Sequence, residues 1–272
     1  MKFVIIGRTR LLVESAKACI AAGHEPVAVI AAKSDPEWAY FDRYAKHLGV
    51  PFTLGLAAWP AADVAISINW PSVIQDLPGY PVLNAHAGDL PRYRGNACPN
   101  WAIINGESHV SVCIHRMVEE LDAGPIYYKG KIKLTDQTYI GDVYEWLDKV
   151  IPRMFADAVT NIGRLTPAAQ VGTPLRCYPR IPSDSRIDWR QSAEQIARLV
   201  RASSKPFDGA YSYHDGQRVT IWRAHAEAID HDYLGIPGQV IALDPLKILT
   251  GNGSLVLETH DATITSTRSR LT

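Results

Sequence analysis

Residues 1–7 read MKFVIIG, and the apolar run within them predicts a buried β-strand over residues 2–6. Helical periodicity follows over residues 9–22 and ends before Gly23, and a second apolar run comes at residues 26–30. Alternating strands and helices with continuously apolar strands are typical of a parallel sheet that is covered on both faces. The sequence therefore predicts an α/β fold with a Rossmann-like, mostly parallel sheet.

The same alternation continues along the chain as far as about residue 163. In open sheets of this kind, ligands bind beyond the carboxyl ends of the strands, so the residues that follow each predicted strand are the first candidates for a site. Further strands are expected at residues 51–54, 64–68, 82–84, 110–117 and 126–134, and helices at 35–48, 96–107 and 139–163, the last with a kink at Pro152.

A change in composition divides the chain after this region. Residues 166–188 are rich in Pro, Gly, Ser and Thr, which indicates a linker. A helix is expected at 189–202, and short strand-like runs separated by turn signals follow it. We therefore expect an α/β domain at 1–165, a linker at 166–188 and a small C-terminal β domain, OB-like, at 189–272.

The overall charge limits the kinds of partner. Among 272 residues, Lys and Arg total 28 and Asp and Glu total 28, so the formal net charge is zero. Non-specific nucleic-acid binding depends on clustered cations that neutralise phosphates, so no nucleic-acid partner is expected. No apolar stretch approaches the length of a membrane span or a signal sequence, which favours a cytoplasmic protein without a membrane partner.

The cysteines and histidines give no sign of a metal site. The four cysteines are scattered without a Cys-x-x-Cys pair, and the histidines show no ligand spacing, so neither a zinc site nor a disulfide framework is expected. The first strand is followed by Gly7-Arg8-Thr9-Arg10 rather than by G-x-G-x-x-G. A nicotinamide-dependent oxidoreductase would normally carry that glycine pattern, so this class is a poor alternative.

Asn84 and His86 lie two residues apart at the end of the predicted strand VLNAH. Side chains alternate along a strand, so both point to the same side. With Asp122 downstream, the set offers an amide for an oxyanion, an imidazole to carry charge and a carboxylate to orient the imidazole. These three functional groups suit a reaction in which an amine attacks a carbonyl carbon. The simpler interpretation is a strand end with a hydrogen-bonded histidine and a turn aspartate, and His115 is expected to be structural.

The ordered set resembles that of the folate-dependent formyltransferases. That family has an Asn-x-His pair at a strand end, a Leu-Pro-x-Tyr-Arg-Gly-like loop and an aspartate in a Leu-Asp-x-Gly turn; the matching residues here are Asn84, His86, residues 90–95 and Asp122. The resemblance covers most of residues 1–165. It implies formyl transfer from 10-formyltetrahydrofolate, with the Asn, His and Asp as catalytic residues. The chain departs from the family at residues 88–89, which are Gly-Asp where Ser-Leu is usual.

The resemblance also implies binding residues on both sides of the strand end. Trp70, Ser72, Val73 and Ile74 follow the preceding strand, where the backbone of the family holds the pterin ring; a plain turn with Trp70 covering the core is the alternative. Arg92, Tyr93 and Arg94 lie beside the catalytic pair and could anchor substrate, because a guanidinium suits phosphate or carboxylate; a solvated loop is the alternative.

Three branches of the family differ in the acceptor of the formyl group. Residues 31–49 are not strongly basic, which disfavours the methionyl-tRNA branch, and the additional β segment disfavours the single-domain glycinamide ribonucleotide branch. Residues 113–117 and 122–124, with 177–178 and 182–185, resemble the domain that formylates a UDP-linked aminoarabinose. The sequence therefore favours an aminosugar N-formyltransferase, with a nucleotide-linked sugar as partner and a role in lipopolysaccharide or O-antigen biosynthesis.

Other functions stay open from the sequence. A methionyl-tRNA formyltransferase and a siderophore hydroxyornithine formylase share the same catalytic residues. A folate- or nucleotide-binding module with a decayed site is a non-enzymatic alternative, although the intact set of Asn84, His86 and Asp122 speaks against it. A homodimer is also considered, with the β domain as its contact surface.

Overall fold

The computed structural model of the chain describes residues 1–229 and 234–272. His231, one of the histidines without ligand spacing, lies outside the described residues. The chain divides into two compact units. The first comprises residues 1–95, 111–132 and 145–177, and the second comprises residues 96–110, 133–144 and 178–272.

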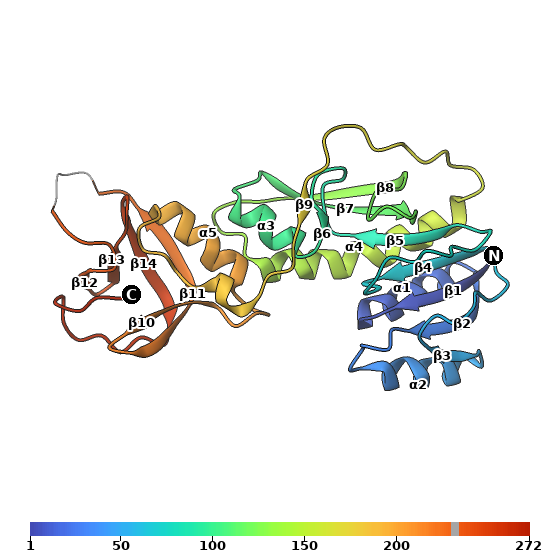
Figure 1. The fold of residues 1–272 in the computed structure, drawn as a ribbon, viewed down its shortest axis with the longest axis horizontal. Helices are drawn as coiled ribbons and strands as arrows, with labels where there is room; N and C mark the ends of the chain where they lie inside the picture. Colours follow the sequence, from blue (N-terminus) through green and yellow to red (C-terminus); the bar gives the residue numbers. More distant parts are fainter. Residues whose placement is uncertain (230–233) are drawn as a thin grey trace. The chain divides into compact units, whose positions relative to one another are not determined.

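A seven-stranded sheet forms the centre of the first unit (Figure 1). Its strand order is β3-β2-β1-β4-β5-β7-β8, and the pairs from β3 to β5 are parallel. β7 runs antiparallel to β5. The strands are β1 (Lys2–Gly7), β2 (Glu25–Ala31), β3 (Phe52–Leu54), β4 (Val64–Ile68), β5 (Val82–His86), β7 (His109–Arg116) and β8 (Ile126–Lys133). The predicted fold class, a mostly parallel Rossmann-like sheet, is thus confirmed.

The apolar runs from which the strands were predicted form the buried central strands of this sheet. Every residue of β4 is buried, as are five of the six residues of β1. At Gly7, the last residue of β1, the backbone comes close to Ile68 at the end of β4. Gly7 has φ +145, and a Cβ there would lie 2.1 Å from the carbonyl oxygen of Ile68. Only glycine fits this close approach. It brings the ends of β1 and β4 together at the edge where the predicted site lies.

Four helices follow the predicted pattern within one to four residues. They are α1 (Arg10–Ala21), α2 (Trp38–Leu48), α4 (Ile140–Asn161, with Pro152 inside) and α5 (Ala193–Ser203). The helix α3 (Cys98–Ile104) is shorter than the predicted 96–107. Ala97 has φ +52, in the left-handed region, so the helix cannot extend toward Asn96.

The second unit has its own core beneath a five-stranded antiparallel sheet with the order β10-β11-β14-β13-β12. Ile196 and Val200 of α5 pack into that core, and the helix begins with a capping box between Ser192 and Gln195. The predicted β segment is therefore a complete sheet. Its strands are β10 (Ala210–His214), β11 (Gln217–Glu227), β12 (Val240–Leu243), β13 (Leu246–Leu249) and β14 (Ser254–His260).

Two very short strands had no counterpart in the sequence prediction. β6 (Arg94–Gly95) pairs in parallel with β9 (Arg176–Cys177). A two-residue strand has too few positions to show alternation, so only the structure reveals it. This pair fastens the loop after β5 to the segment that follows α4, and so holds Gly95 beside the site.

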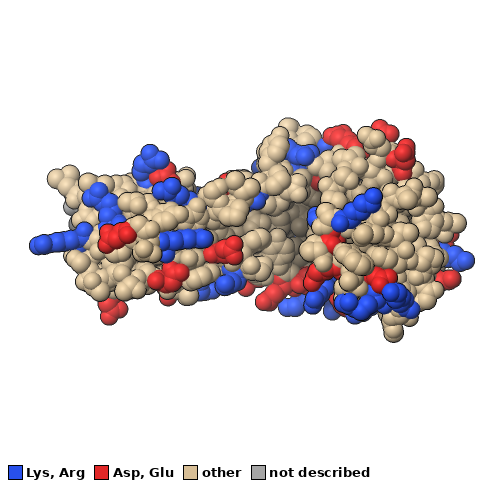
Figure 2. Space-filling model, turned by 60° about the horizontal axis from the view of Figure 1, so that its bottom comes forward, with Lys and Arg blue, Asp and Glu red and all other residues tan. Residues whose placement is uncertain are grey.

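The surface agrees with the balanced composition. On the face shown in Figure 2, basic and acidic side chains are interspersed over each unit. Among the residues that the structure describes, no helix is both long enough and apolar enough to cross a membrane.

Candidate active site

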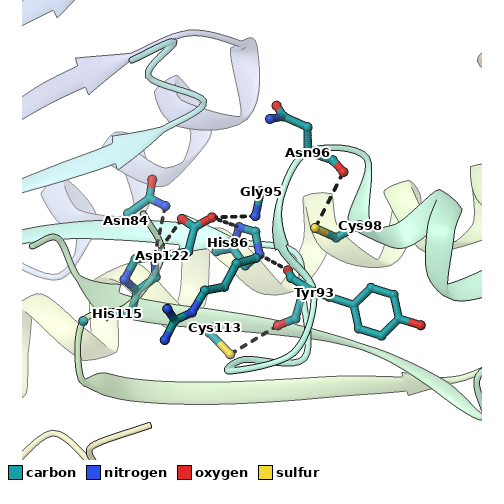
Figure 3. Close-up of polar contacts among 12 residues, drawn as sticks. Asn84, His86, Tyr93, Gly95, Asn96, Cys98, Cys113, His115 and Asp122 are labelled. Carbon is teal, nitrogen blue, oxygen red and sulfur yellow. Dashed lines mark hydrogen bonds and ion pairs between the residues drawn. The ribbon is translucent and has the colours of Figure 1, made fainter. Parts of the chain in front are cut away.

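Asn84 and His86 lie on β5, between the parallel strand β4 and the antiparallel strand β7. The register places Asn84 directly opposite His115 of β7, and the Asn84 Nδ2 donates to His115 Nε2 over 3.2 Å. Asp122 reaches the same point from the loop between β7 and β8 (Figure 3). The structure thus brings together Asn84, His86 and Asp122, and adds His115 to them. We call these four residues the strand-end cluster.

Asp122 is the hub of the strand-end cluster. Its Oδ2 accepts from the Gly95 backbone N–H at 2.9 Å and lies 3.4 Å from His86 Nδ1, and its Oδ1 lies 3.6 Å from His115 Nε2. Burial alone would raise the pKa of the carboxyl group. The contacts with His115, His86 and the Gly95 N–H outweigh burial and lower the pKa of Asp122 to about 2. Asp122 is therefore an anion at neutral pH.

The backbone is shaped to present this carboxylate. Asp122 itself has φ +50, a left-handed conformation that aspartate tolerates better than most residues. Two residues later, a Cβ on Gly124 would lie 1.7 Å from the Arg116 carbonyl oxygen. Glycine is therefore the only residue that lets the loop pass so close to the end of β7.

His86 is buried, with only 7% of its surface exposed. Its Nε2 lies 2.6 Å from the Tyr93 carbonyl oxygen, and since a carbonyl can only accept, Nε2 carries a proton and donates. Burial lowers the pKa of the imidazole below its ordinary value of 6.5, although Asp122 and the Tyr93 carbonyl act in the opposite direction. Burial thus favours the neutral imidazole, in which Nδ1 is the unprotonated nitrogen.

His115, which the sequence suggested was structural, lies inside the strand-end cluster. It is 2% exposed, and its Nδ1 lies 3.1 Å from the Arg116 carbonyl oxygen. That carbonyl can only accept, so Nδ1 carries a proton, and in the tautomer with its proton on Nδ1 the ring accepts from Asn84 at Nε2. The contact fixes which way the Asn84 amide points and leaves its second N–H for another acceptor.

The loop after β5 is built tightly around His86. A Cβ on Gly88 would lie 2.2 Å from the Tyr93 carbonyl oxygen and 2.4 Å from His86 Nε2, so the departure from the usual serine coincides with a place that has no room for a side chain. Its neighbour Asp89 accepts from Ser111 at 2.8 Å and pairs with Lys129 at 2.6 Å. Lys129 therefore compensates the charge of Asp89.

The three predicted substrate residues lie in different environments. Tyr93 is buried, and its backbone carbonyl holds His86. Arg94 is buried, pairs with Glu120 and donates to Gln170 at 2.9 Å. Arg92 is exposed, and its guanidinium lies 5.6 Å from the centre of the Tyr93 ring. Only Arg92 presents its side chain to solvent.

The predicted pterin segment follows β4. Ile74 is buried in a core cluster with Val4 and Ile6, and Trp70 packs partly against the same cluster. Ser72 and Val73 are exposed. Apolar packing thus anchors the segment at both ends.

The arrangement can serve acyl transfer to an amine. Asn84 offers an amide N–H, His86 an imidazole with one unprotonated nitrogen, and Asp122 a buried negative charge that stabilises a proton on that nitrogen. Among the described residues, no three His, Cys, Asp or Glu side chains gather as a metal would require.

Two family models match the chain. "Formyl transferase" matches residues 62–159, which contain the strand-end cluster, and "Formyl transferase, C-terminal domain" matches residues 181–264. Together they cover the two regions that the structure shows as a parallel sheet and a separate antiparallel sheet.

Solved structures share this fold at low identity. An N-formyltransferase from Helicobacter canadensis, in complex with folinic acid and dTDP-3-aminofucose, has a TM-score of 0.73 at 15% identity, covering 95% of this chain and 99% of that one. A methionyl-tRNA formyltransferase from Clostridium thermocellum has a TM-score of 0.57 at 17% identity, covering 84% and 94%. HypX from Aquifex aeolicus, in complex with tetrahydrofolic acid, has a TM-score of 0.62 at 21% identity.

The match to HypX covers 96% of this chain but only 44% of that one, so the chain spans less than half the length of HypX. The matches to the other two proteins cover nearly their whole length. With both family models matched in their order along the chain, the resemblance found in the sequence is confirmed. The chain belongs to the formyl transferase family.

Proposed function

We propose that the protein transfers a formyl group from 10-formyltetrahydrofolate to the amine of a nucleotide-linked aminosugar. The observation that carries this proposal is the convergence of Asn84, His86 and Asp122 in one buried network at the carboxyl end of β5. Ligands of open α/β sheets bind at this edge. Family membership supports the reaction class, and the network supplies the groups that the reaction needs.

In the proposed mechanism the acceptor amine attacks the formyl carbon, and the former carbonyl oxygen becomes an oxyanion. The free N–H of the Asn84 amide donates to that oxyanion, an interaction that strengthens as the charge develops. Neutral His86 takes a proton from the attacking nitrogen, and Asp122 stabilises the resulting imidazolium. The proton then passes to the departing folate nitrogen as the old C–N bond breaks, which leaves the new formamide and tetrahydrofolate.

His115 acts in this scheme as a positioning residue for Asn84. An amide can rotate to present either its oxygen or its nitrogen, and only the nitrogen can donate to an oxyanion. Acceptance by His115 Nε2 at 3.2 Å keeps the nitrogen directed into the strand-end cluster. The role is indirect, since His115 itself need not touch the substrate.

The folate is proposed to bind along residues 70–74, with Trp70, Ser72, Val73 and Ile74 as its binding residues. Ser72 and Val73 are exposed, whereas Ile74 is fixed in the core, so backbone groups there can hold a flat ring without moving. The structural neighbours from Helicobacter canadensis and Aquifex aeolicus are complexes with folinic acid and tetrahydrofolic acid. Their ligands support a folate co-substrate for this chain.

A nucleotide-linked aminosugar is the acceptor that the comparisons favour. The Helicobacter canadensis neighbour is a complex with dTDP-3-aminofucose, and its fold covers nearly the full length of both chains. Arg92 has its guanidinium exposed beside the site and is the proposed contact for a phosphate, with Tyr93 and Arg94 shaping the loop around it. Methionyl-tRNA is the second candidate, because the Clostridium thermocellum enzyme shares the fold; a hydroxyornithine acceptor has no comparable neighbour among these structures.

We further propose that residues 1–165 carry catalysis, that 166–188 link, and that 189–272 form the C-terminal β domain. The strand-end cluster falls entirely within the first of these segments. A cytoplasmic location, a role in lipopolysaccharide or O-antigen biosynthesis and a homodimer through the β domain complete the proposal.

Mass spectrometry of acceptors incubated with the protein and 10-formyltetrahydrofolate tests the function. The panel comprises dTDP-, UDP- and GDP-linked aminosugars, initiator methionyl-tRNA and hydroxyornithine. We expect one aminosugar to gain the mass of a single formyl group, and this gain to disappear in His86→Ala. Formylation of the tRNA or of hydroxyornithine alone would reassign the acceptor, and folate binding without any product would refute the transferase assignment.

A further inference from the structure

The second unit contains a small polar cavity that the proposed formyl transfer does not use. Its volume is about 210 Å³, and it lies between the end of α3, the segment that joins β8 to α4 and one face of α5. Its polar lining includes two arginines, two carboxylates and three hydroxyls: Arg198, Arg201, Glu107, Asp136, Ser108, Thr135 and Thr138. All of these residues belong to the second unit.

Arg201 is unusual because it is buried although its Nε has no hydrogen-bond partner among the described residues. Only 8% of its surface is exposed, and its Nε is completely buried and unpartnered among the described residues. Its only ion pair within that part of the chain is with Asp136, at 3.8 Å, and the Asp136 side chain is fully exposed. A contact of that length to a solvated carboxylate compensates little of the cost of burying a guanidinium.

Arg198 lies one helical turn earlier on α5 and faces the same cavity. Its Nε is also buried and unpartnered among the described residues. A Cβ on Gly106 would lie 2.6 Å from Arg198 Nη1, so the guanidinium rests against the glycine turn that follows α3. The turn thereby holds the side chain over the cavity.

Two arginines three residues apart on a helix repel each other, and an anion bound between them relieves that repulsion. Forked N–H donors on planar guanidinium groups match the oxygens of a phosphate, and the nearby hydroxyls can donate to the same oxygens. Glu107 and Asp136 oppose an anion in this place. Asp136 is fully exposed and therefore screened by water, while the Arg201 charge is shielded from water.

We propose that Arg198 and Arg201 bind a phosphate group in this cavity, at a site separate from the strand-end cluster. The cavity volume suits one phosphate group rather than a whole nucleotide. The group could be inorganic phosphate or a phosphate that a nucleotide presents at the cavity mouth.

Isothermal titration calorimetry with inorganic phosphate in a low-salt chloride buffer tests the proposal, using the full chain. We expect saturable one-site binding that Arg198→Met and Arg201→Met each weaken at least tenfold. Arg190→Met is the matched control, because Arg190 is an exposed arginine of the same unit and pairs with Asp188; it should leave binding unchanged. Asp136→Asn should tighten binding severalfold, since it removes a competing carboxylate.

Two further measurements separate this site from others. His86→Ala should bind phosphate as the unmodified protein does, because its ring lies in the first unit. If a nucleotide presents the phosphate, uridine diphosphate should bind more tightly than inorganic phosphate and should lose affinity in the double variant Arg198→Met/Arg201→Met. If free phosphate is the ligand, uridine diphosphate should bind no more tightly than inorganic phosphate. Phosphate binding that is equally strong in the double variant, or absent from the folded wild-type protein, would overturn the proposal.

The thermal stability of Arg201→Met distinguishes a binding role of the arginine from a structural one. Met in place of a buried arginine removes a charge that its 3.8 Å contact with Asp136 compensates only weakly, so the thermal midpoint of Arg201→Met without phosphate should equal or exceed that of the wild-type protein. Phosphate should raise the thermal midpoint of the wild-type protein but not that of Arg201→Met. A large fall in the phosphate-free midpoint would show that Arg201 supports the fold and would contradict the site.

Discussion

The strand-end cluster and the arginine pair on α5 both bury charge, yet they differ in how that charge is satisfied. Asp122 accepts from the Gly95 backbone N–H and lies 3.4 and 3.6 Å from nitrogens of His86 and His115, and the other nitrogen of each ring donates to a backbone carbonyl. Arg198 and Arg201 have buried donors that no described residue accepts. Charge that is satisfied internally orients neighbouring groups, whereas charge left unsatisfied creates an affinity for a ligand. The first region is therefore preorganised for chemistry, and the second is prepared for binding.

Removal of the negative charge of Asp122 should have the largest effect on the reaction rate. Asp122→Asn keeps the size of the side chain but takes away the anion that stabilises a proton on His86, so we expect kcat to fall roughly 10²- to 10⁴-fold. Glu194→Gln, which neutralises an exposed carboxylate at the start of α5, is the control and should retain activity. Steady-state rates with the identified acceptor measure the difference. Equal rates for the two variants would remove Asp122 from the mechanism.

Crowding the loop around His86 should have the next largest effect. Gly88→Ala forces a Cβ to within 2.4 Å of His86 Nε2, and we expect it to reduce the free energy of unfolding by about 1–3 kcal/mol and to impair turnover. Gly79→Ala introduces the same change where no atom lies within 4 Å, and it should shift stability by no more than about 0.5 kcal/mol. Urea denaturation of both variants provides the comparison, and similar stabilities would show that the loop yields easily.

The pH dependence of stability separates the contributions of the two ionisable partners. The pKa of Asp122 is lowered to about 2 from an ordinary value of 3.8, so its stabilisation is present above pH 3.8 and is lost as the pH falls through 2. A difference of that size corresponds to about 2 kcal/mol. His86 has a pKa below 6.5, so stability also begins to fall as the unfolded histidine is protonated below pH 6.5.

The stability difference between wild type and Asp122→Asn should therefore shrink between pH 4 and pH 2. Denaturant unfolding at pH 7, 4 and 2.5 measures it. A difference that stayed constant over this range would mean that the Asp122 carboxyl has an unshifted pKa in the folded protein.

The smallest effect is expected at His115. His115→Phe keeps a buried ring but removes the acceptor for the Asn84 amide, and we expect kcat to fall about tenfold, or about 1.4 kcal/mol in barrier, with KM little changed. If His115 acts through Asn84, the loss in the Asn84→Ala/His115→Phe double variant should equal that of Asn84→Ala alone. Losses that multiply would indicate an independent or purely structural contribution.

Much of the first unit could be predicted because its central strands β1 and β4 are almost entirely apolar and buried. β4 matched its predicted bounds, since five consecutive buried residues leave no ambiguity about burial on both faces. Asn84 and His86 could be identified because they interrupt such a run at its end. Asp122 required the family resemblance, since nothing in local periodicity connects a turn residue to a strand that ends 36 positions earlier.

The remaining features depend on long-range register. His115 joins the cluster because it pairs opposite Asn84, and the register between β5 and β7 cannot be obtained from either strand alone. Similarly, the loop arginines looked equivalent in sequence, but Arg94 finds Glu120 and Gln170 whereas Arg92 is exposed. The burial of Arg201 on α5 likewise depends on tertiary contacts, which the sequence of the helix alone does not show.

The central claim is that the strand-end cluster carries formyl transfer, and single-turnover rates of Asn84→Ala and His86→Ala test it most directly. Each rate should be measured with saturating 10-formyltetrahydrofolate and acceptor, beside the affinity of each variant for folate. We expect the transfer rate to fall at least about 10²-fold in each variant, with folate affinity within about threefold of wild type, because the lost groups act on the transition state. Turnover close to that of the wild-type protein in either variant would contradict the assignment of that residue.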